Sequence, residues 1–162
     1  MGTNSKAWLA GSVLGVLGII MSAGVFIFIT LKTERIFGIV AVLCGALSGG
    51  AVGLGYKVAK GELTSKSQVT SFLWVLTFFG LLGVLTAYFG PYILFLGDLS
   101  FGEYISFIEL DIKDAFFIFI GAYGGRWVGE AIARSIILKG MKQEALQDIK
   151  QTRIQNIDKK LK

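Results

Sequence analysis

Four long apolar stretches dominate the sequence, at residues 7–31, 36–56, 70–97 and 114–138. A helix needs about 20 apolar residues to cross the ~30 Å hydrocarbon core of a bilayer, because each residue adds about 1.5 Å along the axis. Each stretch is long enough. The first also exceeds the ~7–15 residues of a signal-peptide core, so we expect a spanning helix there rather than a cleaved signal. The prediction is an all-α membrane protein with four transmembrane helices in a domain at 1–138.

The composition narrows the chemistry that such a protein can perform. The chain has no His and a single Cys, Cys44, so it can form neither an internal disulfide nor a His/Cys metal site. Ser–His and Cys–His nucleophilic pairs are excluded for the same reason. The Gly-rich run 49–55 lacks the following Lys-Ser/Thr of a phosphate-binding loop. We therefore expect no enzyme activity, no cofactor and no metal.

The distribution of basic residues predicts how the chain sits in the membrane. The 57–66 loop has three Lys and the segment 139–162 has seven Lys or Arg, whereas 98–112 has neither. Because cytoplasmic loops carry the excess of Lys and Arg, we predict a multi-pass protein of the cell membrane with both termini in the cytoplasm. The net charge of +5 follows from this topology, so we expect the lipid bilayer, and not nucleic acid, as the partner.

Small residues recur every four positions in the second and fourth stretches. Residues i and i+4 lie above one another on a helix, and faces of small residues let membrane helices approach closely. The sequence predicts two such helix-packing faces: Ala41, Gly45, Gly49 and Gly53, and Gly121, Gly125, Gly129 and Ala133. Gly11 and Gly15 are candidate partners for the first face. Packing within one chain is favoured over a dimer seam.

The fourth stretch carries an intramembrane charge site, formed by Arg126, Glu130 and Arg134. Their spacing of four places them on one helical face. Each charge at membrane depth costs at least ~2.5–3.5 kcal/mol. In a structural interpretation, Glu130 neutralises Arg126 and the pair fastens helices or docks a partner subunit, while Arg134 snorkels to the cytoplasmic end. In a functional interpretation, the pair lines a polar cavity for an anion, a proton or a lipid headgroup. We favour the first, because the other stretches offer only Ser and Thr as polar partners.

The third stretch, 70–97, is too long for a straight crossing, at roughly 42 Å against a core of ~30 Å. Pro91 removes one backbone donor and clashes with the carbonyl of Ala87. We therefore predict a kink or break at Pro91. Tyr88, Phe89 and Tyr92 are expected in an aromatic belt at the membrane surface.

Two polar segments complete the chain. In 98–112, Ser100 and Glu103 fit a capping box ahead of apolar residues at helical spacing, which predicts a short interfacial helix between the third and fourth spans. An ordered loop that caps the bundle is the alternative. Residues 139–162 are expected to form a basic cytoplasmic tail, solvated and partly helical, whose charge favours the anionic leaflet.

Residues 45–61, GALSGGAVGLGYKVAKG, end a Gly-rich helix in a basic turn that contains Gly, and Gln68 and a third span follow. This arrangement resembles a pattern in small uncharacterised bacterial multi-span membrane proteins. The resemblance implies a bacterial membrane location and implies no chemistry. The Arg126–Glu130 pair is not part of it.

These observations favour a non-enzymatic membrane subunit or an accessory or assembly protein. Its partners are then other membrane subunits or further copies of the chain. The alternative is a small ion or solute channel or transporter that uses the Arg126–Glu130 pair. A reconstituted flux assay separates the two functions, because Arg126→Ala abolishes flux only in the second.

Overall fold

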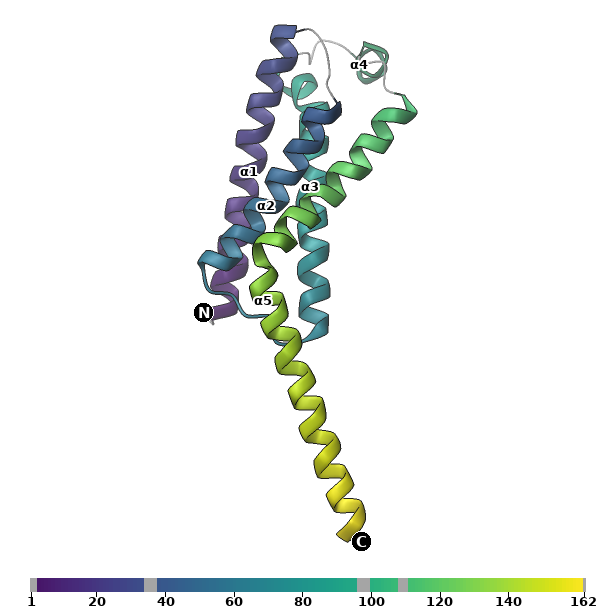
Figure 1. The fold of residues 1–162 in the computed structure, drawn as a ribbon. Helices are drawn as coiled ribbons and strands as arrows, with labels where there is room; N and C mark the ends of the chain where they lie inside the picture. The colour runs from purple at the N-terminus through teal and green to yellow at the C-terminus, as the bar shows by residue number, and fades with distance from the viewer. Residues whose placement is uncertain (1–2, 34–37, 96–99, 108–110, 162) are drawn as a thin grey trace.

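The computed structural model of the chain is an elongated bundle of helices (Figure 1). It describes residues 3–33, 38–95, 100–107 and 111–161. The elements are α1 (Thr3–Thr33), α2 (Gly38–Val58), α3 (Lys66–Phe95), α4 (Phe101–Phe107) and α5 (Ile112–Leu161). Within the described ranges every element is a helix, which confirms the all-α fold class.

Three of the described helices are long and apolar enough to cross a membrane. The segments are Asn4–Thr30 of α1, the whole of α2, and Lys66–Leu94 of α3. They match the first three predicted spans, although the predicted start at Ile36 and the predicted end at Gly97 lie outside the described residues. The chain therefore has the helices of a small polytopic membrane protein. α5, which contains the fourth predicted span, is not among these three.

The helix α2 lies at the centre of the bundle, where it packs against α1, α3 and α5. One core cluster joins all four long helices through Ala7, Val52, Phe72 and Ala133, each of which is almost completely buried. A second cluster, nearer the opposite end, is built around Phe26, Cys44 and Val84. Most buried residues of α2 are small, so its neighbours can come close to its backbone on several sides. This allows α2 to occupy the central position.

The helix α3 continues through Pro91 to Phe95. The sequence predicted a kink or a break at Pro91. The helix does not break there. Pro91 is buried, so packing holds the helix together where one backbone hydrogen bond is missing. Neighbouring helices commonly make proline tolerable in membrane helices in this way.

The short helix α4 covers the end of α3. Ser100 and Glu103 form the expected capping box: the Ser100 N–H donates to Glu103 Oε2 at 2.7 Å, and the Glu103 N–H donates to Ser100 Oγ at 3.3 Å. Hydrogen bonding to the Glu103 carboxylate, first by the Ser100 side chain and then by the Ser100 N–H, lowers the pKa of this carboxyl. The Tyr104 hydroxyl donates to the carbonyl of Tyr88, which ties α4 to α3.

The aromatic residues predicted to form a surface belt pack against α4 and α5 at this end of the bundle, and their depth in a membrane stays a prediction. Tyr88 is 1% exposed, and its hydroxyl donates to Asp114 Oδ1 at 2.7 Å, so it joins α3 to the start of α5. Phe89 lies 6.0 Å from the ring of Phe101, and Tyr92 lies 4.9 Å from that of Tyr104. These rings therefore cap the bundle by packing on α4.

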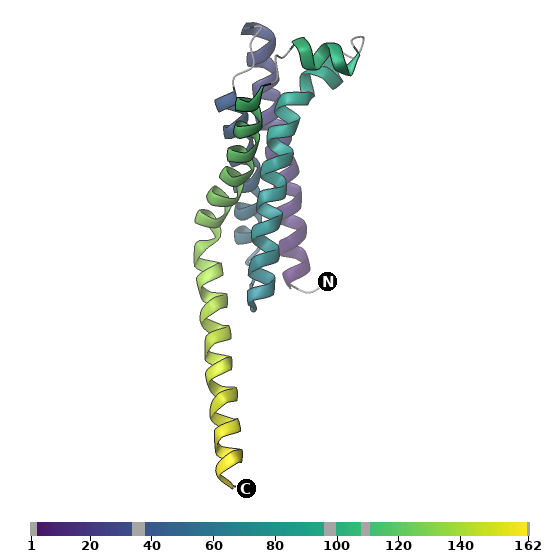
Figure 2. The same ribbon diagram turned by 90° about the vertical axis from the view of Figure 1, so that its right-hand side faces the viewer.

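The helix α5 is continuous over 50 residues, or about 75 Å. It crosses the expected boundary between the membrane domain and the tail at residues 138 and 139 without a break. The expected partly helical tail is therefore one helix with the fourth apolar stretch. Figures 1 and 2 show its last third as a straight rod that leaves the bundle at the end where α1 begins.

Candidate functional site on α5

One side of α5 meets α2 through matched glycines. A Cβ atom on Gly45 would overlap the carbonyl of Gly121, and one on Gly49 would overlap the backbone of Gly125. A Cβ on Gly53 would lie 2.5 Å from the carbonyl oxygen of Gly129. The two small-residue faces predicted from the sequence thus lie against each other, with each glycine of α2 opposite one glycine of α5. We call these six residues the glycine ladder.

Other glycines bring α3 and α1 equally close. A Cβ on Gly125 would lie 2.6 Å from the Cα of Gly80, so α2, α3 and α5 converge at Gly125. The suggested partner Gly11 instead meets another face of α2: a Cβ on Gly55 would lie 2.9 Å from the Cα of Gly11. The candidates Gly11 and Gly15 are therefore not the partners of the Gly45–Gly53 face, which α5 occupies.

The charged stripe of Arg126, Glu130 and Arg134 lies at the edge of this contact. Arg126 and Glu130 are partly exposed, and Arg134 is exposed. The Arg126 guanidinium carbon lies 5.9 Å from the centre of the Tyr123 ring, one turn earlier on α5. In the described part of the chain the ion pairs are Lys113–Asp111 and Lys139–Glu62, both outside the stripe. The predicted Arg126–Glu130 ion pair is therefore not formed.

The side of α5 that faces away from the bundle is rich in aromatic residues. Trp127 is 78% exposed, and Phe116, Phe119 and Tyr123 are each more than half exposed. These four residues and the charged stripe form what we call the outer face of α5. Arginine beside exposed aromatic rings is a combination that is enriched in the cores of protein–protein interfaces.

Sequence reasoning missed the contacts that fasten the turn between α2 and α3. The one hydrogen of the Tyr56 hydroxyl is shared between two acceptors, Asn4 Oδ1 at 2.9 Å and the Glu62 carbonyl at 3.0 Å, while the Glu62 N–H donates to Asn4 Oδ1 at 3.1 Å. Asn4 is more than 50 residues from the other two in the sequence, and no periodic pattern links them. The only available signal was the presence of polar residues at the ends of apolar stretches.

The described residues contain no group of three His, Cys, Asp or Glu side chains that could hold a metal ion. Comparison of the chain with protein-family models, with curated proteins and with solved structures finds no match. The resemblance to bacterial multi-span proteins therefore stays a prediction, and a function has to be argued from the faces of α5.

Proposed function

We propose that the chain is a multi-pass protein of the cell membrane in which α5 supplies a fourth span and α4 lies at the outer surface. The glycine ladder supports this depth assignment. Gly49 lies near the middle of α2, which is apolar enough to span, and it touches Gly125. If α2 spans, Arg126 therefore lies near the centre of the bilayer. Arg134 then lies about 12 Å closer to the end that carries the α5 rod.

At this depth the chain alone compensates Arg126 poorly. Burial of the charge costs at least ~2.5–3.5 kcal/mol. The cation–π contact with Tyr123 offsets about 0.5–2 kcal/mol of this cost. Glu130 adds a second charge without forming an ion pair with the first. A polar group on a partner helix would supply the missing compensation for Arg126.

We infer that the outer face of α5 docks a membrane partner, and that the protein is a non-enzymatic membrane subunit or accessory protein. The single observation that carries this function is the stripe of three charges without an ion pair, set beside exposed aromatic rings. A partner helix that offers opposite charges would complete both Arg126 and Glu130. Another copy of the chain also carries positive and negative charges on α5, so self-association is one form of this function.

Site-specific photo-crosslinking in native membranes tests the proposal. A photoreactive residue at Trp127 should give a crosslinked protein of defined size. The matched control at Ile20, which is 62% exposed on α1, should give none. Arg126→Gln should reduce the Trp127 crosslink about tenfold or more, because leaving a desolvated charge unpaired costs about 2–5 kcal/mol. Equal crosslinking at the two positions, or no effect of Arg126→Gln, would contradict the proposal.

The channel or transporter alternative predicts a different result. Purified protein reconstituted into vesicles would carry a solute or ion flux that Arg126→Ala abolishes. The same substitution in a docking subunit leaves vesicle flux at background and releases the partner. Flux that depends on Arg126 would overturn the subunit proposal.

A further inference from the structure

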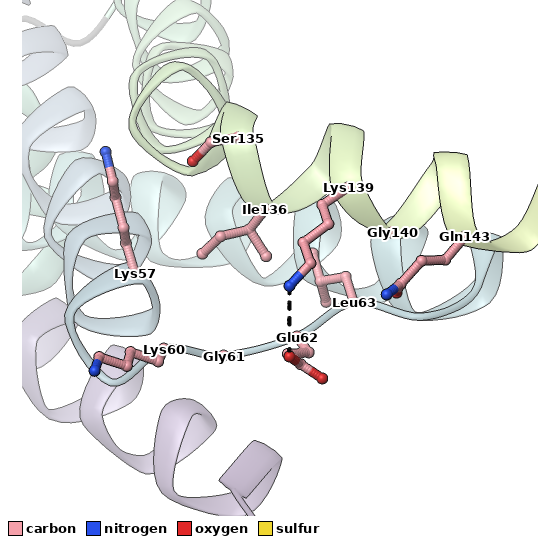
Figure 3. Close-up of a pocket in the computed structure, with 10 residues that line it drawn as sticks. All are labelled: Lys57, Lys60, Gly61, Glu62, Leu63, Ser135, Ile136, Lys139, Gly140 and Gln143. Atoms are coloured by element: carbon pink, nitrogen blue, oxygen red, sulfur yellow. Dashed lines mark ion pairs between the residues drawn. The ribbon is translucent and has the colours of Figure 1, made fainter.

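A cleft of about 430 Å³ lies between the α2–α3 turn and α5. Figure 3 shows the turn along one side and the helix along the other. Three of its lining residues are lysines and one is a glutamate. The residues used below are Lys57, Lys60, Gly61, Glu62, Lys139 and Gly140.

The walls of this cleft are held in place from several directions. A Cβ on Gly61 would overlap the ring of Tyr56, and one on Gly140 would overlap the carbonyl of Leu63, so the turn is clamped between α2 and α5. The Lys66 N–H donates to Glu144 Oε2 at 2.9 Å, which adds a second tie to α5. The backbone of this cleft is therefore preorganised, so a ligand has to order only the exposed lysine side chains.

The charge of the cleft is positive. Lys139 Nζ lies 3.8 Å from Glu62 Oε1 and partly satisfies that carboxylate. The structure describes no ion pair for Lys57 or Lys60. Figure 3 shows their ammonium ends pointing away from Lys139, so both side chains would turn toward a shared anion on binding. Three ammonium groups against one carboxylate leave a net charge of +2 for an anion to neutralise.

The position of Lys60 is conformationally costly. Lys60 has a φ of 54°, the only positive φ among the described non-glycine residues. It follows the end of α2 in a Schellman turn, in which the Gly61 N–H bonds to the Tyr56 carbonyl and the Lys60 N–H to the Lys57 carbonyl, both at 3.0 Å. Glycine is the residue that such a position prefers. A lysine there is an outlier that invites a functional explanation.

We propose that this cleft binds a phosphate-bearing anion through Lys57, Lys60 and Lys139, and that its source is the headgroup of an anionic phospholipid. The apolar spans end beside it: the α2 span ends at Val58, the α3 span begins at Lys66, and the α1 span begins at Asn4. The cleft thus lies at the level of the headgroups, where basic residues attract anionic lipid. This inference rests on the four-span arrangement proposed above, because α5 must run along α2 to bring Lys139 to the cleft, and it is independent of what docks on α5.

Binding of phosphatidylglycerol to the purified full-length protein, counted by native mass spectrometry from detergent, tests the proposal. Lys57→Gln and Lys60→Gly should each raise the dissociation constant about fivefold, the usual contribution of one surface lysine. Lys142→Gln is the matched control: Lys142 is an exposed lysine on α5 that does not line the cleft. It should leave the dissociation constant within about twofold of the parent value.

Two further arms make the result decisive. Lys60→Gly should raise the thermal midpoint without lipid, because glycine relieves the positive φ, so its weaker binding cannot be ascribed to misfolding. Phosphatidylcholine and inorganic phosphate identify the source: weak binding of both supports the phospholipid headgroup, whereas phosphate binding as tight as that of phosphatidylglycerol overturns it in favour of a free anion. Unchanged lipid binding in both cleft variants, or an equal loss in Lys142→Gln, would overturn the site altogether.

Discussion

At the scale of single residues, the close packing of the bundle depends on glycines, which have no side chain to hold the helices apart. Gly49 and Gly125 touch backbone to backbone, so even one methyl group has no room between α2 and α5. Gly24 on α1 has no atom within 4 Å of the place that a methyl group would occupy. The same substitution at Gly49 and Gly24 therefore isolates the contribution of the glycine ladder.

We predict that Gly49→Ala destabilises the folded protein by about 1–3 kcal/mol, because overpacking forces the helices apart. Gly24→Ala should be neutral or slightly stabilising, since alanine favours the helix and meets nothing. Denaturation in detergent micelles, followed by circular dichroism, measures both. A Gly49→Ala variant as stable as Gly24→Ala would mean that α2 and α5 are not in contact.

The capping box of α4 predicts a pH dependence. Hydrogen bonds from Ser100 lower the pKa of Glu103 in the folded chain, so their stabilisation is complete above the unfolded pKa and is lost as pH falls through the folded one. Amide hydrogen exchange within 101–107 should therefore become faster on acidification, after correction for the intrinsic rate. Glu103→Gln should remove this pH dependence. Persistence of the same acid transition in Glu103→Gln would assign it to another group.

At the scale of elements, α5 is one continuous helix whose first half is packed in the bundle and whose following turns are exposed. Its first half packs through the glycine ladder, and its side chains from Met141 to Ile154 are mostly exposed. In the sequence the fourth apolar stretch is followed by Lys139 and Gly140, and a glycine in this position often ends a helix. In the structure Gly140 is instead the point where the α2–α3 turn crosses α5. Local sequence does not distinguish a helix end from such a close approach.

A proline in the α5 rod should separate its role from that of the bundle. Ala145→Pro removes one backbone hydrogen bond and clashes with the carbonyl of Met141, at a cost of about 3 kcal/mol to the rod. Helical content should fall while the thermal midpoint of the bundle changes little, because Ala145 is exposed and the neighbouring hydrogen bond from Lys66 N–H to Glu144 is exposed as well. Ala145→Gly is the control and should largely keep the helix. A lowered bundle midpoint for Ala145→Pro alone would show that the rod supports the bundle.

At the scale of the whole molecule, the sequence predicted the faces of the helices better than their partners. The spacing of Gly45, Gly49 and Gly53 indicates a face, but the choice between α1 and α5 as its neighbour depends on the complete packing. The prediction of an Arg126–Glu130 ion pair was wrong for a related reason. Spacing shows that two side chains can meet, whereas their rotamers respond to surroundings such as the ring of Tyr123.

The number of spans decides whether Arg126 lies in the membrane at all, and the topology of the chain tests it. Single cysteines at Ser106 and Gln143, both exposed, are introduced after Cys44→Ala. With four spans, a membrane-impermeant maleimide added to intact cells should label Ser106→Cys and reach Gln143→Cys only after permeabilisation. With three spans, α5 stays on the side of α4, and both cysteines react in intact cells. Labelling of both cysteines from outside would therefore remove the charged stripe from the bilayer, and with it the energetic argument for a docked partner.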